Sequence, residues 1–257
     1  MSDGKVHRLP VQPKRSSTTA VAPPPSQRVA LVSGANRGIG LEVAKQLAAL
    51  GMTVFIGSRE LAKGEKAARA LREMGGDAYA VRLDVTQAAD IDHGVAMVDG
   101  RCGRLDILIN NAGGHFDQRS RASDGDLASI RNALDTNLLG AWRLSAAVLP
   151  LMRRHGYGRI VNVSSECAVR NMCGENAPAY RVSKAALNAY TQIVAREVAG
   201  SGILVNAVCP GWTATEMGGS GGRPAAESAE GIVWAALLPE GNAASGDFYR
   251  DHKKIAW

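Results

Sequence analysis

The chain of 257 residues lacks several features that mark membrane and secreted proteins. It has no run of about eighteen apolar residues, so no segment is expected to span a membrane. Its first residues lack the apolar core of a signal peptide, and we expect a cytoplasmic protein. Its few cysteines form no CxxC pair and are expected to be reduced thiols. They are Cys102, Cys167, Cys173 and Cys209.

Histidine and excess charge are also sparse. The five histidines are scattered, without an HExxH motif or a short-spaced Cys/His group, so no metal site is expected. The net charge is +6, and residues 1–27 supply +3 of it, because they hold four basic residues and one acidic residue. The remaining +3 is spread over the rest of the chain, and we expect no nucleic-acid partner.

Residues 1–27 differ in composition from the rest of the chain. They contain five of the ten prolines and the run RSSTTAVAPPP. Such a segment has too little apolar surface to form a core, so we expect a disordered basic tail. Residues 28–257 are expected to form a single folded domain, a size that one hydrophobic core supports.

From residue 28 onward, short apolar runs alternate with segments whose apolar residues recur at helical spacing. This alternation predicts an α/β fold, a doubly wound (Rossmann) parallel sheet with helices on both faces. Ligands of such folds bind at the carboxyl ends of the strands. We expect strands near 28–34, 53–58, 78–85, 105–113, 158–165, 203–211 and 246–250, and helices near 40–51, 59–76, 88–103, 124–154 and 178–190, with one short helix after them.

The first expected strand runs into the loop SGANRGIG, in which Gly34, Gly38 and Gly40 have the spacing GxxxGxG. Glycine lets the backbone turn tightly and approach a pyrophosphate, and the N-terminus of the following helix attracts the anion. Between a strand and a helix, this pattern predicts a dinucleotide site. A plain glycine-rich turn is the alternative.

The cofactor type is expected to depend on two arginines. The second strand ends in GSRE, with Arg59 where an NAD site usually offers an acid, and Arg37 adds a positive charge within the glycine loop. The always-charged planar fork of arginine suits the 2′-phosphate of NADP(H), which is therefore expected, with NAD as the less favoured cofactor. A solvated arginine is the alternative at each position, and Glu60 is expected to begin the next helix.

The segment YRVSK places Tyr180 and Lys184 four residues apart near the start of an expected helix, and therefore on one face. A phenol beside an ammonium group is either an acid–base pair or two surface side chains. The spacing alone leaves both interpretations open.

Seven motifs, in order, resemble those of the short-chain dehydrogenase/reductase family, and SGDFYRDHKKIAW is similar to its carbonyl-reductase-like branch. The resemblance covers residues 28–257 and implies hydride transfer between NADP(H) and a carbonyl compound or secondary alcohol, with ketone or aldehyde reduction favoured. An NAD-dependent alcohol dehydrogenase and a non-catalytic dinucleotide-sensing protein are the alternatives. The motifs are SGANRGIG, LDV, NNAG, TNLLGA, VNVSS, YRVSK and NAVCPGWTATEMGG.

The resemblance also implies catalytic roles. Tyr180 is the expected acid/base, and Lys184 is expected to lower its pKa and to hold the nicotinamide ribose. Ser165 is expected to donate to the carbonyl oxygen, with Ser164 as the second choice. Asn137 is expected to hold a water of a proton relay, and a core asparagine bonded to backbone is the alternative.

The remaining site residues follow from the same resemblance. A small-molecule carbonyl or alcohol substrate is implied, with His115, Met172, Trp212 and Met217 as candidate contacts or plain packing residues. The loop between Ser165 and Tyr180 is about two residues longer than is usual in the family and is expected to line the pocket. Both a homo-oligomer and a monomer occur among such proteins. The implied cofactor contacts are Gly34, Asn36, Arg37, Gly38, Ile39, Gly40, Arg59, Asp84, Val85, Asn110, Asn111, Ala112, Gly113, Tyr180, Lys184, Pro210, Gly211, Thr213 and Thr215.

Overall fold

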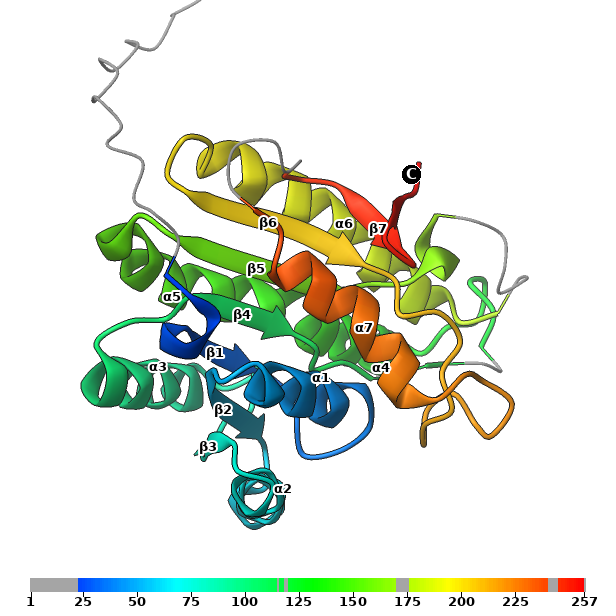
Figure 1. The fold of residues 1–257 in the computed structure, drawn as a ribbon. Helices are drawn as coiled ribbons and strands as arrows, with labels where there is room; N and C mark the ends of the chain where they lie inside the picture. The colour runs from blue at the N-terminus through cyan, green and yellow to red at the C-terminus, as the bar shows by residue number, and fades with distance from the viewer. Residues whose placement is uncertain (1–22, 115, 118–119, 170–175, 240–244, 257) are drawn as a thin grey trace, which may run out of the picture.

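An eight-stranded sheet forms the middle of the fold (Figure 1). The computed structural model describes residues 23–114, 116–117, 120–169, 176–239 and 245–256. The strand order is β3-β2-β1-β4-β5-β6-β7-β8, and all neighbours from β3 to β7 are parallel. The strands are β1 (Val29–Val32), β2 (Thr53–Ser58), β3 (Asp77–Arg82), β4 (Ile107–Asn110), β5 (Gly158–Val163), β6 (Ile203–Val208), β7 (Phe248–Arg250) and β8 (Lys253–Lys254).

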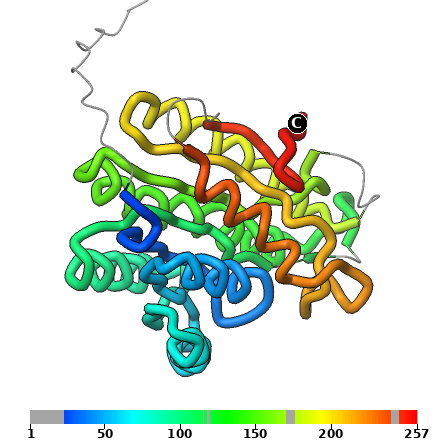
Figure 2. Tube along the Cα trace, viewed as in Figure 1, coloured from blue at the N-terminus to red at the C-terminus, as the bar shows by residue number. Residues whose placement is uncertain are grey.

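Helices cover both faces of this sheet, and the chain path in Figure 2 shows the same two layers around it. One face carries α1 (Gly38–Ala49), α2 (Leu61–Glu73) and α7 (Ala225–Ala236). The other face carries α3 (Ala88–Cys102), α5 (Gly140–His155) and α6 (Pro178–Glu197). Strands buried on both sides need apolar residues at every position, which explains the continuous apolar runs. The predicted doubly wound α/β sheet is thus confirmed.

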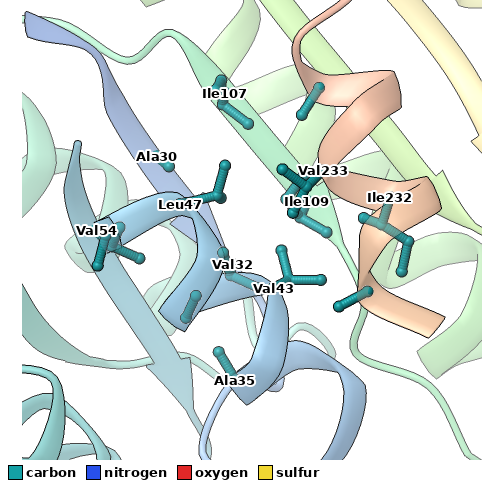
Figure 3. Close-up of a cluster of buried hydrophobic side chains, with 14 of the residues drawn as sticks. Ala30, Val32, Ala35, Val43, Leu47, Val54, Ile107, Ile109, Ile232 and Val233 are labelled. Carbon is teal, nitrogen blue, oxygen red and sulfur yellow. The ribbon is translucent and has the colours of Figure 1, made fainter. Parts of the chain in front are cut away.

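The core on the α1 side shows how the first βαβ unit is held. Leu47 and Val43 of α1 lie beside Ile232 and Val233 of α7, and both helices pack on strand residues such as Ile109 (Figure 3). All five are buried. This packing fixes the N-terminus of α1 at the carboxyl end of β1, where the glycine loop lies.

The expected helix at 124–154 is a composite. It consists of α4 (Leu127–Leu134), a π-helical turn η2 (Asp135–Leu139) and α5. A π turn inserts one extra residue into the helical repeat, and such turns are frequent at functional sites. The turn contains Asn137, which the sequence singled out.

Two other details differ from the expectations. The strand near 246–250 continues into an antiparallel hairpin with β8, whose turn places Asp251 (φ 48°) and His252 (φ 63°) in the left-handed region. Neither residue is glycine, so the usual hairpin signal is missing. The expected tail ends at residue 27, but Pro25–Gln27 form a 3₁₀ turn that leads into β1. The described structure begins at Pro23, and residues 1–22 of the expected tail lie outside it. No helix among the described residues is long and apolar enough to cross a membrane.

Candidate active site

A cavity of about 500 Å³ lies at the carboxyl ends of β5 and β6. Parallel strands bring such ends to one edge of the sheet, where doubly wound folds bind their ligands. Side chains and backbone from several separate segments of the chain line it. They are Ile39, Phe116, Ser165, Glu166, Cys167, Tyr180, Cys209, Pro210, Gly211, Trp212, Thr213, Thr215, Met217, Gly218 and Arg250.

Tyr180 and Ser165 both line this cavity, and Ser165 acts on the phenol, because it opposes the rise in the pKa of Tyr180. The Ser165 hydroxyl also accepts from the Cys167 N–H at 3.2 Å, which fixes the short turn η3 (Glu166–Ala168). Ser164 instead is buried, and its hydroxyl donates to the Lys184 carbonyl at 3.4 Å. Of the two serines, therefore, the first choice of the sequence faces the cavity.

Lys184 lies behind the tyrosine on the same face of α6. Its Nζ is buried, donates to the Val163 carbonyl at 2.7 Å, and lies 5.8 Å from the centre of the Tyr180 ring. Burial lowers the pKa of Lys184 to about 8, because a charged ammonium is poorly solvated there. The predicted juxtaposition of phenol and ammonium is present.

Burial also raises the pKa of Tyr180 to about 12, although its hydrogen bond with Ser165 acts in the opposite direction. The sequence led to the expectation that Lys184 would lower this pKa. Desolvation of the phenolate instead dominates the shift, and a lowering of this pKa by Lys184 stays a prediction. The consequence is that Tyr180 carries its proton at neutral pH and can donate it.

Asn137 is buried in the π turn and its amide is fully engaged. Its Oδ1 accepts from the Gly114 N–H at 2.9 Å, while its Nδ2 donates to the Gly114 carbonyl at 3.0 Å and to the Ser183 hydroxyl at 2.9 Å. The side chain thus holds the segment after β4 against α6, as in the alternative of a backbone-bonded core asparagine. A role in a proton relay stays a prediction.

The glycine loop packs directly against the end of β4. The Asn111 amide donates to the carbonyls of Ser33 (2.9 Å) and Gly34 (3.1 Å). Gly34 has φ +64°, and a Cβ on Gly40 would lie 2.4 Å from the Asn111 Nδ2, so no larger residue fits at Gly40 without displacing the loop. Asn36, Gly38 and Ile39 belong to the same turn and the start of α1, and Ala112 and Gly113 to the facing segment.

The two arginines proposed for the 2′-phosphate lie near a common carboxylate. The pKa of the exposed Glu60 is lowered, first by its hydrogen bond with Lys63 and further by the charges of Arg59 and Arg37. Arg37 also forms an exposed ion pair with Glu216, from the segment that follows β6. The two arginines thus lie near Glu60 and Glu216, and their contact with a 2′-phosphate stays a prediction.

Other predicted cofactor residues have side chains already engaged within the protein. The Asp84 carboxylate accepts from the Thr86 N–H and hydroxyl, and Val85 lies in the core on the α5 side. Thr213 is buried, with its hydroxyl 2.7 Å from that of Ser228. The contacts of Asp84, Val85 and Thr213 with a dinucleotide stay predictions.

A family model described as short chain dehydrogenase matches residues 28–224. The chain belongs to the short-chain dehydrogenase family. Short-chain reductase protein NovJ of Streptomyces niveus is 39% identical over 201 residues, which cover 78% of this chain and 74% of that protein. A 3-oxoacyl-acyl-carrier-protein reductase of Synechocystis sp. is 37% identical over 192 residues, which cover 74% of this chain and 76% of that protein.

This short-chain dehydrogenase is also similar in structure to a ketoreductase. The crystal structure of a variant of actinorhodin polyketide ketoreductase with NADPH superposes with a TM-score of 0.80 at 30% sequence identity. The match covers 88% of this chain and 96% of that chain. The expected family is thereby confirmed.

Sequence reasoning missed several residues of this short-chain dehydrogenase's cavity. The ring of Phe116 packs edge-on against that of Tyr180, with centroids 5.0 Å apart. The Cys209 thiol accepts from the N–H groups of Glu166 (3.3 Å) and Gly211 (3.4 Å), and burial raises its pKa to about 11. The sequence could have indicated Glu166, because it directly follows Ser165, the expected hydrogen-bond donor. Phe116 and Cys209 resemble ordinary core residues in the sequence.

The substrate candidates divide into two groups. Trp212 and Met217 line the cavity, while His115 and Met172 lie outside the described residues.

One expectation about the cysteines is wrong, because Cys167 is disulfide-bonded rather than reduced. Two cysteines pair only where the fold brings their Cα atoms close together, which the spacing of cysteines did not reveal. Cys102 and Cys209 are free thiols, and across the described segments no three His, Cys, Asp or Glu side chains gather as a metal ion would require.

Proposed function

We propose that this short-chain dehydrogenase reduces a ketone or aldehyde with NADPH. The observation that carries the proposal is that Tyr180 and Ser165 line the same cavity, with Lys184 one helical turn behind the tyrosine. The names of its relatives, among them a 3-oxoacyl-acyl-carrier-protein reductase, and the NADPH-containing ketoreductase structure support reduction over oxidation.

The geometry supports a simple division of labour during reduction. NADPH supplies the hydride when bound. Ser165 donates a hydrogen bond to the substrate carbonyl oxygen, which stabilises the negative charge that develops there. Tyr180 transfers its phenolic proton to that oxygen, because its pKa of about 12 keeps it protonated at neutral pH. The Lys184 ammonium, 5.8 Å from the ring centre, stabilises the phenolate left behind.

The residues present also fit a dinucleotide phosphate. The glycine loop offers its backbone to a phosphate, since Gly40 packs too tightly to carry a Cβ and Gly34 has a positive φ of 64°. Arg37 and Arg59, which act on one carboxylate, are proposed to hold the 2′-phosphate. Pro210 and Gly211, which line the cavity next to Tyr180, are proposed to cover the nicotinamide.

The proposal is tested by cofactor oxidation with a panel of ketones and aldehydes, measured separately with NADPH and NADH. The expected result is turnover with NADPH that the Tyr180→Phe variant lacks. An NAD-dependent alcohol dehydrogenase would instead prefer NAD and alcohols. A dinucleotide-sensing protein would bind NADPH without turning over any substrate, which would contradict the proposal.

A second copy of this chain is the proposed protein partner. The outer faces of α5 and α6 carry exposed apolar residues, Trp142 (47% exposed) and Ile193 (59% exposed), and Trp142 stacks on Tyr190 between the two helices. Apolar helix faces of this kind are usual at interfaces. Ile193→Glu should lower the mass measured by light scattering, whereas Met74→Glu, at the end of α2, serves as the control and should not. If the wild-type protein itself has the mass of a monomer, the proposal is contradicted.

A cytoplasmic location also stays a proposal. The disulfide at Cys167 is the observation that counts against it, since disulfides persist mainly in oxidising compartments. Cell fractionation of the tagged protein tests it, and recovery outside the cytosolic fraction would contradict it.

A further inference from the structure

Glu166 and Arg250 are the two formally charged residues among the described lining of the cavity. They form an ion pair in which the Arg250 Nη1 donates to the Glu166 Oε2. The side chain of Glu166 is 9% exposed, while that of Arg250 is 33% exposed. The carboxylate is thus nearly removed from water, and the guanidinium remains open to the cavity.

This pair joins two segments that are 84 residues apart in the chain. Glu166 follows Ser165 directly in the turn η3, and Arg250 ends β7, the strand that leads into the C-terminal hairpin. The hairpin turn adds a second acid, because the Arg250 Nε lies 3.3 Å from the Asp251 Oδ2. Asp251 is shared with Arg223, whose Nη1 lies 2.6 Å from it. The charges of two arginines are therefore balanced by two carboxylates.

A nearly buried carboxylate that loses its partner is strongly unfavourable, so Glu166 holds Arg250 in place. A substrate carboxylate would have to compete for this arginine and would also lie beside the negative charge of Glu166. The remaining lining offers no other formal charge within the described part and includes the apolar side chains of Phe116, Trp212 and Met217. As it stands, the cavity favours an uncharged ligand.

We infer that Glu166 determines substrate charge: by occupying Arg250, it makes the cavity accept uncharged carbonyl compounds and reject ketones that carry a carboxylate. The inference rests on the proposed function and deepens it. Without the Glu166 charge, Arg250 keeps only the Asp251 carboxylate that it shares with Arg223, so its guanidinium charge can attract a substrate carboxylate. Glu166 would then be a specificity-determining residue beside the catalytic pair.

The test uses Glu166→Gln and two pairs of ketones, benzoylformate and 4-acetylbenzoate, each with its methyl ester. Glutamine keeps the size of the side chain and one oxygen to accept from Arg250, so the fold should be retained. Wild type should prefer the esters. In the variant, the ratio of kcat/KM for the acid to that for its ester should rise about tenfold or more, as for one new charge-assisted hydrogen bond.

Two further variants isolate the cause. Glu197→Gln makes the same change in an exposed ion pair with Arg153 outside the cavity, and it should leave the ratio unchanged. Adding Arg250→Met to Glu166→Gln should abolish the gain, because the gain requires the guanidinium charge that Glu166 no longer balances. A wild type that prefers the acids, an unchanged ratio in Glu166→Gln, or a gain that survives loss of Arg250 would each overturn the inference.

A binding measurement separates this inference from the proposed function. Trp212 lines the cavity, so its fluorescence can report binding of benzoate and of the neutral analogue benzamide without turnover. Glu166→Gln should bind benzoate about tenfold more tightly relative to benzamide than wild type does. If no ketone is reduced, the proposed function fails and this binding ratio alone decides the inference. If the glutamine variant melts far below wild type, Glu166→Met replaces it with the same expected ratios.

Discussion

The carboxylate of Asp117 caps the helix that carries Tyr180. Its two oxygens accept hydrogen bonds from the N–H groups of Ala179 (3.1 Å) and Tyr180 (3.2 Å), although Asp117 lies 63 residues before the tyrosine. The first N–H groups of a helix have no carbonyl partner within the helix, and a negative charge near them also complements the helix dipole. The cap therefore sets where α6 begins and so where the phenol lies.

Asp117→Ala should lower both stability and turnover. Loss of a cap typically costs about 1 kcal/mol of unfolding free energy, and a displaced Tyr180 should reduce kcat more than NADPH binding. Asp117→Asn retains an accepting oxygen and should recover most of both. Asp126 caps α4 through the N–H groups of Ala128 and Ser129, so Asp126→Ala is the matched control, expected to lower the melting temperature without a change in kcat. Equal kcat losses in the two alanine variants would contradict this role of Asp117.

Tyr180→Phe should reduce kcat by at least about 100-fold, because it removes the transferable proton while the ring and its packing against Phe116 remain. NADPH binding, measured by fluorescence titration, should stay within a few-fold of wild type. Residual activity above about a tenth of wild type would mean that another group supplies the proton.

Arg59→Asp should reverse the cofactor preference. The substitution removes a charge-assisted hydrogen bond to the 2′-phosphate, adds repulsion toward it, and offers a carboxylate to the ribose of NADH. We expect kcat/KM for NADPH to fall by about one to two orders of magnitude, while that for NADH holds or rises. The measurement is kcat/KM for both cofactors at low and moderate salt. If the ratio of the two values does not fall, Arg59 plays no part in the selection.

The pH profile of reduction should report Lys184. Burial lowers its pKa from 10.5 to about 8, so its charge is lost as the pH rises above about 8. Since that charge stabilises the tyrosinate, log kcat/KM should decline above this pH, whereas the pKa of Tyr180, about 12, lies too high to contribute below pH 10. A profile that stays flat to pH 9.5 would contradict the role given to Lys184.

Unfolding would not explain such a decline. The folded pKa of Lys184 lies below its unfolded value, so the unfolded chain binds more protons between about pH 8 and 10.5. The contribution of this group to stability therefore increases over that range. A melting temperature measured at each pH checks that the protein stays folded while activity falls.

Gly40→Ala should abolish NADPH binding, because the added Cβ would lie 2.4 Å from the Asn111 Nδ2 and 2.6 Å from the Gly34 carbonyl oxygen. Either contact forces the loop out of its turn. Gly100→Ala is the matched control, since a Cβ at this helical position meets nothing within 4 Å. It should leave binding unchanged and stabilise α3 by about 0.5–1 kcal/mol. Comparable NADPH affinities in both variants would contradict the role of the loop.

The sequence by itself determined the order of elements and the family, and it proposed the catalytic set. Apolar runs such as Val29–Val32, buried on both faces, and the spacing of Tyr180 and Lys184 are local patterns, and local patterns can be interpreted along the chain. The glycine loop was also predictable, because it stands between a strand and a helix. These features depend on residues that are near one another in sequence.

Only the tertiary structure decided what surrounds that set. Asp117 reaches the start of α6, and Arg250 reaches Glu166, across separations that no periodicity records. The π turn at Asn137 packs against α4, α5 and α6, and the raised pKa of Tyr180 follows mainly from burial. Such effects depend on which side chains the fold places together and on how much water it excludes, and both are properties of the whole packed molecule.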